Sequence, residues 1–211
     1  LESARVLDDD RWRVQLDDGR ELTARLLVGA DGAQSKVRQL AGIGTGGWSY
    51  DQQGLVANVR TAEPHQATAW QRFLPTGPLA FLPLHDGRCS IVWSTAPEQA
   101  DFLLALDDYD FGQALGDAFE WWLGPIVQIG QRGAFPLRLQ HTHQYVKPGL
   151  ALIGDAAHVV HPLAGQGVNL GLLDAATLAE VVLDAVAVGQ DIGSLKVLRR
   201  YERWRKGDNL L

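Results

Sequence analysis

Residues 149–171 read GLALIGDAAHVVHPLAGQGVNLG and join a short apolar run, an acidic turn and a glycine-rich segment. The apolar run Leu150–Ile153 predicts a buried strand that ends at Gly154 and Asp155. The Asp155 carboxylate then lies at the carboxyl end of a strand, which is the edge where open α/β sheets bind their ligands. This stretch therefore predicts a ligand site at a sheet edge, with a carboxylate suited to a ribose hydroxyl.

A glycine-rich helix start follows the acidic turn. Pro162, Gly165 and Gly167 lead into a predicted helix over residues 166–188. The first turn of a helix has free backbone N–H groups and the positive end of the helix dipole, so it attracts phosphate and other delocalised anions. Because glycine has no Cβ, the backbone of this segment can approach a ligand closely. Both features are typical of a site for a diphosphate-bearing cofactor.

Residues 26–38, LLVGADGAQSKVR, form a second apolar strand that ends in an Asp-Gly pair. Together with GDAAH at 154–158 and HPLAGQGVNLG at 161–171, this segment resembles the two FAD motifs of single-component aromatic hydroxylases. These are the group A flavoprotein monooxygenases with the para-hydroxybenzoate hydroxylase-like fold, and the variant here is most similar to that of the ubiquinone-biosynthesis hydroxylases. Two motifs in the family's order, separated by an insert of substrate-domain size, are a more specific signal than either motif alone.

The resemblance implies cofactor-binding roles for residues of both motifs. At the first motif it places Asp31, Gly32 and Arg38 at the FAD and NAD(P)H pyrophosphates. At the second it places Asp155 at the ribitol or ribose of FAD, and the turn before the helix beside the isoalloxazine ring. The full cofactor-binding set is Asp31, Gly32, Arg38, Gly154, Asp155, Pro162, Gly165, Gln166, Gly167, Val168 and Asn169. No catalytic side chain is implied, because the flavin carries the difficult chemistry.

The resemblance also implies a reaction. The expected enzyme is an FAD-dependent monooxygenase that uses NAD(P)H and O₂ to hydroxylate a phenolic ring through a flavin C4a-hydroperoxide. A small aromatic substrate, in particular a polyprenylated ubiquinone precursor, is the expected partner. The family's opening Gly-x-Gly-x-x-Gly element has no counterpart before Leu26, so the chain is expected to be a fragment that is inactive by itself.

Two other functions are compatible with these motifs. One is a non-catalytic module that binds a substrate or joins a complex, and the other is a flavin reductase or halogenase of the same fold. A parent chain with an N-terminal Gly-x-Gly-x-x-Gly segment would favour the enzyme over the non-catalytic module. The sequence contains no Trp-x-Trp-x-Ile-Pro string like that of the halogenases, which argues against halogenation.

The composition excludes several other classes of protein. The net charge of -6, from 19 basic and 25 acidic residues, provides no basic surface for nucleic acid. The single cysteine, Cys89, excludes an internal disulfide and fits a reducing cytoplasm, and its expected place is a strand in the core. The longest apolar stretch, residues 170–188, contains three acidic residues. Any association with the inner membrane or a biosynthetic complex is therefore expected to be peripheral.

The pattern of elements predicts an α/β (α+β) fold in two parts. The resemblance implies that residues 1–49 and 145–211 form a partial Rossmann-like FAD-binding domain and that residues 50–144 form an inserted substrate domain. Several β-rich runs in the insert are separated by turns such as Pro75–Pro78 and His85–Gly87, which predicts a mainly antiparallel sheet.

Local patterns predict further elements. Residues 3–28 alternate as a small meander, and residues 35–40 read as a short helix with Ser35 as a candidate N-cap. Pro136 favours an edge or a bulge for its strand. In the helix after the second motif, six apolar residues keep amphipathic helical spacing: Val168, Leu172, Ala175, Ala179, Val182 and Val186.

Two groups of residues have more than one interpretation. Trp70, Phe73, Phe81 and Trp93 on the predicted sheet either line a pocket for a quinol ring or pack in the core. His158 and His161 are three residues apart, but no third ligand with zinc-like spacing accompanies them. No metal site is therefore predicted.

Overall fold

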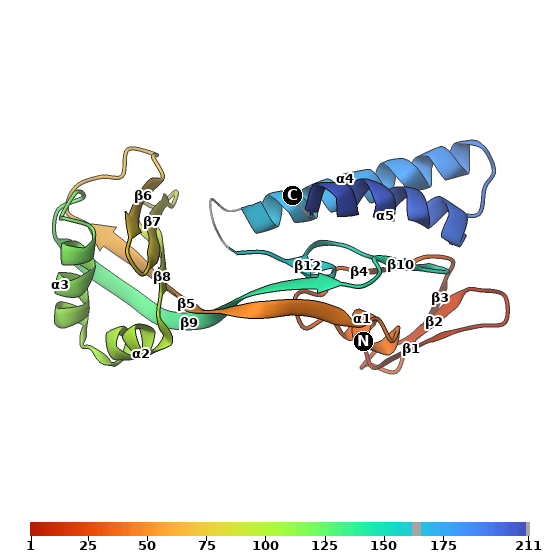
Figure 1. The fold of residues 1–211 in the computed structure, drawn as a ribbon, viewed down its shortest axis with the longest axis horizontal. Helices are drawn as coiled ribbons and strands as arrows, with labels where there is room; N and C mark the ends of the chain where they lie inside the picture. The colour runs from red at the N-terminus through yellow and green to blue at the C-terminus, as the bar shows by residue number, and fades with distance from the viewer. Residues whose placement is uncertain (162–165, 210–211) are drawn as a thin grey trace. The chain divides into compact units, whose positions relative to one another are not determined.

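The computed structural model describes residues 1–161 and 166–209. The chain divides into two compact units. Unit 1 consists of Leu1–Trp48 and Leu139–Leu211, and unit 2 consists of Ser49–Arg138. Figure 1 labels the elements of both units along the chain.

Unit 1 contains two small three-stranded sheets. The first has the antiparallel order β1-β2-β3, with β1 at Ser3–Val6, β2 at Trp12–Gln15 and β3 at Glu21–Ala24. The second has the order β10-β11-β4, with β10 at Val146–Lys147, β11 at Leu150–Leu152 and β4 at Leu27–Gly29. The predicted meander is confirmed, but its last run is divided, because β3 pairs with β2 whereas β4 pairs with β11.

The strands of the two motifs lie side by side. β4 and β11 pair in parallel, with Leu27 opposite Leu150 and Gly29 opposite Leu152. The prediction that these strands share one region, although about 120 residues separate them, is therefore confirmed. Because the strands are parallel, the turns after them leave the sheet at the same edge.

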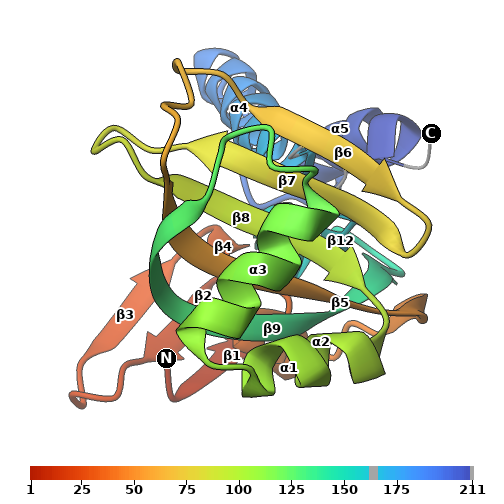
Figure 2. The same ribbon diagram turned by 90° about the vertical axis from the view of Figure 1, so that its left-hand side faces the viewer.

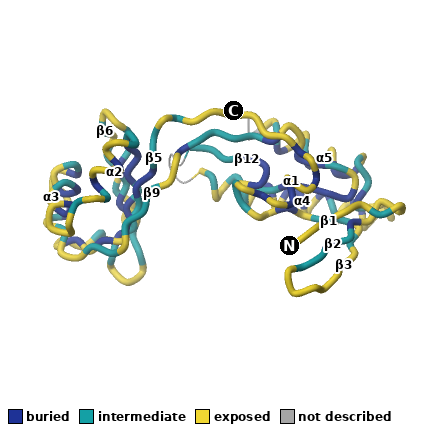
Figure 3. Tube along the Cα trace, turned by 90° about the horizontal axis from the view of Figure 1, so that it is seen from below, coloured by how far each residue is buried: buried dark blue, intermediate teal, exposed yellow. Residues whose placement is uncertain are grey.

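In the part of the chain that the structure describes, unit 1 has two long helices: α4 at Gln166–Ala187, which begins inside the second motif, and α5 at Leu195–Asn209. The buried face of α4 is not the one that the apolar spacing indicated. Of the six apolar positions, Val182 is half-buried and the others are exposed, whereas the buried residues of α4 are Asp174, Thr177, Leu178, Val181 and Ala185. Figure 3 colours the chain trace by the burial of each residue. The rotation of α4 is set by Asp174, which points inward to pair with buried Arg205 of α5.

Unit 2 contains a mainly antiparallel sheet, as predicted. The pairing order is β5-β8-β7-β6, with β5 at Thr45–Thr61, β8 at Cys89–Thr95, β7 at Gly77–Pro83 and β6 at Trp70–Leu74. Helices α2 (Pro97–Ala105) and α3 (Asp108–Ala118) come after β8 and pack on this sheet (Figure 2). A core of apolar side chains joins them, and it includes Phe81, Trp93, Leu103, Phe111 and buried Cys89.

The other long strand, β9, spans Ile126–Thr142. It pairs with the short strand β12 (His158–Val159) only at Gln140 and His141, so Pro136 lies beyond that pairing, as expected for a residue that cannot donate to a ladder. β9 continues from unit 2 to residue 142, and residues 139–144 group with unit 1.

The four aromatic residues with two interpretations are not equivalent. Phe81 and Trp93 are buried in the core of unit 2, and Trp70 packs against that core. Phe73, whose side chain is 75% exposed, is outside it. Core packing therefore accounts for three of these side chains.

Candidate functional site

The turn after β4 is built around Asp31. Its carboxylate accepts hydrogen bonds from the Ser35 hydroxyl and from the Val37 N–H, the latter at 3.0 Å. Ser35 is the N-cap of the short helix α1 (Lys36–Leu40) and accepts a hydrogen bond from the Arg38 N–H, also at 3.0 Å. Burial alone would raise the pKa of Asp31, but the hydrogen bonds from Ser35 and Val37 outweigh it and hold the pKa below its ordinary value. Asp31 therefore organises the start of α1.

Gly32 comes directly after Asp31 with a φ of +80°, which is the left-handed region that side chains with a Cβ avoid. No group of the residues that the structure describes lies within 4 Å of the position that a Cβ would take there. Glycine is required at this position by backbone geometry, and the space beside it is open.

Arg38 connects the two motif turns. Its side chain is buried, and its guanidinium donates to the Ala33 carbonyl at 2.7 Å and to the Ala156 carbonyl at 2.9 Å. Gln140 of β9 also donates to the Ala33 carbonyl, at 3.2 Å. The sequence placed Arg38 at a pyrophosphate, and these contacts give it a positioning role between the turn after β4 and the turn after β11.

The turn after β11 is a single 3₁₀ turn, η1, at Gly154–Ala156. Gly154 has a φ of +57°, again in the left-handed region. Asp155 is exposed, and its carboxylate makes no hydrogen bond or ion pair with any residue that the structure describes. This carboxylate is therefore available to a ligand at the edge that the sequence predicted.

The first turn of α4 contains four of the predicted site residues, Gln166, Gly167, Val168 and Asn169. Among the described residues, a Cβ at Gly167 would meet only the Val160 side chain, at 3.9 Å, which is an ordinary contact. These residues therefore give no packing reason for glycine at 167. Pro162 and Gly165, the other predicted residues of this segment, lie outside the described residues.

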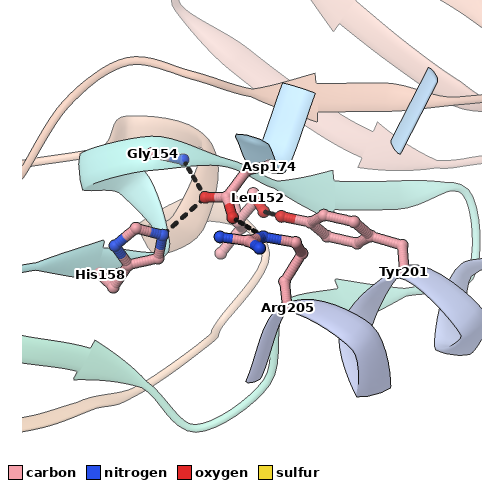
Figure 4. Close-up of polar contacts among 6 residues, drawn as sticks. All are labelled: Leu152, Gly154, His158, Asp174, Tyr201 and Arg205. Atoms are coloured by element: carbon pink, nitrogen blue, oxygen red, sulfur yellow. Dashed lines mark hydrogen bonds and ion pairs between the residues drawn. The ribbon is translucent and has the colours of Figure 1, made fainter. Parts of the chain in front are cut away.

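A buried polar network lies behind the second turn (Figure 4). The Asp174 carboxylate accepts from the Gly154 N–H at 2.9 Å, from His158 Nε2 at 2.6 Å and from Arg205 Nε at 2.7 Å. The side chains of Asp174, His158 and Arg205 are 0%, 1% and 2% exposed. Burial alone would raise the pKa of Asp174, but hydrogen bonds from His158 and Arg205 outweigh it and hold the pKa below its ordinary value.

The sequence prediction did not assign roles to Asp174 or Arg205. A carboxylate in the middle of an apolar helix was the available signal, because such a residue is rarely buried unless it is paired. The described residues contain no group of three or more His, Cys, Asp or Glu that could hold a metal ion. His158 binds the Asp174 carboxylate instead.

The family is decided by a match over almost the whole chain. The family model of the FAD binding domain matches residues 6–207. The chain belongs to the FAD binding domain family. This agrees with the family that the two motifs predicted, and in this FAD binding domain both turns of the site lie within the matched range.

Two curated relatives of this FAD binding domain carry informative names. The 3-demethoxyubiquinol 3-hydroxylase of Escherichia coli (strain K12) is 42% identical over 203 residues, which are 96% of this chain and 52% of the relative. The mitochondrial ubiquinone biosynthesis monooxygenase COQ6 of Mus musculus is 40% identical over 241 residues, covering 97% of this chain and 50% of the relative. The chain spans about half the length of the curated relatives it matches.

A solved structure supports the fold. The p-nitrophenol 4-monooxygenase PnpA from Pseudomonas putida DLL-E4 superimposes with a TM-score of 0.75 at 23% identity, covering 97% of this chain and 52% of that one. The predicted fold class, a partial FAD-binding domain with an inserted antiparallel sheet, is therefore confirmed. Among the helices that the structure describes, none is both long enough and apolar enough to span a membrane.

Proposed function

We propose that this chain is the part of an FAD-dependent monooxygenase that supplies two turns of the flavin site and the substrate domain. The observation that carries this proposal is the parallel pairing of β4 with β11, which brings the Asp31-Gly32 turn and the Gly154-Asp155 turn to one sheet edge. Membership of the FAD binding domain family supports the same cofactor.

The residues at this edge fit FAD chemically. Gly32 and Gly154 have left-handed backbones, and the space at Gly32 is open, which suits a diphosphate close to the main chain. The exposed Asp155 carboxylate suits a ribitol or ribose hydroxyl. The N–H groups in the first turn of α4, beside Gly167, suit an anionic group, and we assign them to the ring edge that becomes negative on reduction.

When bound, FAD supplies the oxygen-transfer chemistry, with NAD(P)H as reductant and O₂ as co-substrate. The residues of this chain bind and orient it. Asp155 fixes the sugar chain, Arg38 keeps the two turns at a constant separation through the Ala33 and Ala156 carbonyls, and the dipole of α4 stabilises negative charge. We assign the sheet of unit 2 to substrate binding and the exclusion of water.

The substrate that we propose is a phenolic ring carrying a polyprenyl tail, such as a ubiquinone precursor. Its support is the names of the E. coli and mouse relatives, both enzymes of ubiquinone metabolism at 40% identity or above. A cytoplasmic enzyme that associates peripherally with the inner membrane would suit such a lipid-soluble substrate. A reductase, a halogenase or a non-catalytic module remains the alternative that the experiment must exclude.

The test uses the purified full-length protein that carries this chain. Its visible absorption spectrum is recorded during titration with FAD, and NAD(P)H oxidation is then monitored with and without a prenylated phenol. We expect bound flavin, and oxidation coupled to a hydroxylated product. Failure to bind FAD would contradict the enzyme and favour the non-catalytic module. Bound flavin with oxidation but no hydroxylated product would favour a reductase, and a halogenated product formed with added halide would favour a halogenase.

A further inference from the structure

The Asp174 carboxylate of α4 binds the Gly154-Asp155 turn through hydrogen bonds. Asp174 Oδ2 accepts from the Gly154 N–H at 2.9 Å and from His158 Nε2 at 2.6 Å, so one oxygen contacts the start of the turn and the first residue of β12. Gly154 and His158 flank Asp155, whose own carboxylate is exposed. The position of Asp155 therefore depends on a contact made by another residue.

The contact between α4 and the turn is close. A Cβ built on Gly171 would lie 3.3 Å from the Gly154 Cα, and one built on Gly154 would lie 3.7 Å from the Gly171 Cα. Gly171 is one helical turn before Asp174, so the two glycines let α4 approach the turn and allow the Gly154 hydrogen bond to form. The separation of the turn from α4 is thus fixed by packing as well as by hydrogen bonding.

The other carboxylate oxygen connects the turn to α5. Asp174 Oδ1 accepts from Arg205 Nε at 2.7 Å, and both side chains are almost wholly buried. Removing one partner of a buried ion pair leaves the other charge uncompensated, so the orientation of Asp174 depends on Arg205. One helical turn earlier, the Tyr201 hydroxyl donates to the Leu152 carbonyl at 2.7 Å, at the end of β11. Helix α5 therefore contacts the strand before the turn directly and the turn itself through Asp174.

We propose that Asp174 is a positioning residue of the flavin site, and that through Asp174 and Arg205 the helix α5 sets the geometry of the Gly154-Asp155 turn. The identity of the ligand in this inference rests on the proposed function. The link between α5 and the turn rests on the hydrogen bonds alone. Neither Asp174 nor Arg205 touches the cofactor in this account. They act by holding Gly154, and Gly154 places the Asp155 carboxylate.

The test compares Asp174→Asn with two controls in the full-length protein. The asparagine keeps the shape but loses the charge that orders the Arg205 and His158 donors. Val181→Ala is the stability control, because Val181 is buried in the same helix two helical turns after Asp174. Arg200→Met is the ion-pair control, because Arg200 also joins α5 to α4, through exposed Asp184 at 2.7 Å.

We expect Asp174→Asn to raise the Kd for FAD by about 5- to 150-fold, which corresponds to the loss of one buried polar contact. We also expect the Gly154 amide of the FAD-free protein to exchange faster with solvent. Val181→Ala and Arg200→Met should leave both quantities near those of the unsubstituted protein. An Asp174→Asn protein with an unchanged Kd and unchanged Gly154 exchange would overturn the proposal, and so would a Val181→Ala protein that loses as much affinity.

A milder variant covers the case in which Asp174→Asn does not fold. Arg205→Lys keeps the positive charge but removes the Nε donor that binds Asp174 Oδ1 at 2.7 Å. It should raise the Kd for FAD by about 2- to 10-fold and accelerate Gly154 exchange. No change in either quantity would then overturn the role of α5. If the unsubstituted protein bound no FAD, the proposed function would fail, while Gly154 exchange in the variants would still decide whether Asp174 positions the turn.

Discussion

Asp31 and Asp155 occupy equivalent places at the ends of two adjacent parallel strands, yet their hydrogen bonding differs. Both oxygens of Asp31 accept hydrogen bonds from the start of α1, although the residue is exposed. Asp155 is also exposed, but it makes no hydrogen bond or ion pair to the described residues. The same residue type at the same sheet edge therefore has two roles: Asp31 stabilises the fold of its turn, and Asp155 is available to the ligand.

The difference originates in the segment that the chain enters after each turn. After Asp31 the chain makes a short turn and enters α1 at Lys36, so orphan N–H groups at the start of that helix lie within reach of a carboxylate and a serine. After Asp155 the chain makes one 3₁₀ turn and continues into β12, and its Gly154 N–H is satisfied by Asp174 from another helix. Because a distant residue satisfies that backbone, the Asp155 carboxylate is left unused.

The largest effect is expected from Asp155→Ala. In the full-length protein it should weaken FAD binding by about 5- to 150-fold, because it removes a polar contact worth about 1 to 3 kcal/mol. The melting temperature of the FAD-free protein should not change, since Asp155 is exposed and makes no hydrogen bond or ion pair with the described residues. Flavin titration and thermal melts measure the two quantities. Asp8→Ala, at an exposed hairpin turn in the same unit, is the matched control.

Asp31→Ala should have the opposite signature. Loss of the capping interactions at α1 should destabilise the FAD-free protein by about 0.5 to 2 kcal/mol. FAD affinity should fall less than in Asp155→Ala, because the cofactor would contact the Gly32 backbone rather than this carboxylate. Denaturant unfolding and flavin titration test this together. An Asp31→Ala protein of unchanged stability but with the larger loss of affinity would reverse the comparison.

Gly167→Ala separates ligand contact from helix stability. An alanine inside a helix is favoured over glycine by about 0.5 to 1 kcal/mol, and among the described residues its Cβ would make only an ordinary contact with Val160 at 3.9 Å. The FAD-free protein should therefore be as stable or slightly more stable, while flavin occupancy and the reduction potential of bound flavin should fall. Normal binding with an unshifted potential would show that Gly167 does not contact the cofactor.

The smallest effect concerns acid stability. The folded pKa of Asp31 is lowered, so its contribution to stability is present above the unfolded value of about 3.9 and is lost as pH falls through the lower folded value. The stability difference between the unsubstituted protein and Asp31→Ala should therefore shrink on going from about pH 5 to about pH 2. Urea unfolding across this range measures it. A difference that stays constant would show that the Asp31 carboxylate is not the stabilising group.

Much of the fold could be predicted from local sequence patterns. Two apolar runs that each end in an Asp-containing glycine turn resemble the family's two FAD motifs, and this resemblance predicted adjacent strands with ligand turns at the edge where open α/β sheets bind ligands. The β-rich runs and their turns predicted the antiparallel sheet of unit 2. Cys89 was expected in the core and lies there.

The parts that the sequence did not predict depend on partners far along the chain. The spacing of apolar residues on α4 indicated a stripe through Val168 and Val186, but the helix is rotated so that Asp174 faces inward. That rotation depends on Arg205, which lies 31 residues later and gives no local signal. The different hydrogen bonding of Asp31 and Asp155 could not be predicted for a similar reason, because it depends on which N–H groups lie near each carboxylate in the folded chain.

The central claim is that the two turns form one flavin site, and hydrogen exchange with and without FAD tests it most directly. At saturating FAD in the full-length protein, amides of both turns, residues 30–34 and 153–157, should gain protection together. The hairpin turn between β1 and β2, residues 8–10, should be unaffected and serves as the internal control. Protection of only one turn, or of neither, would contradict the account.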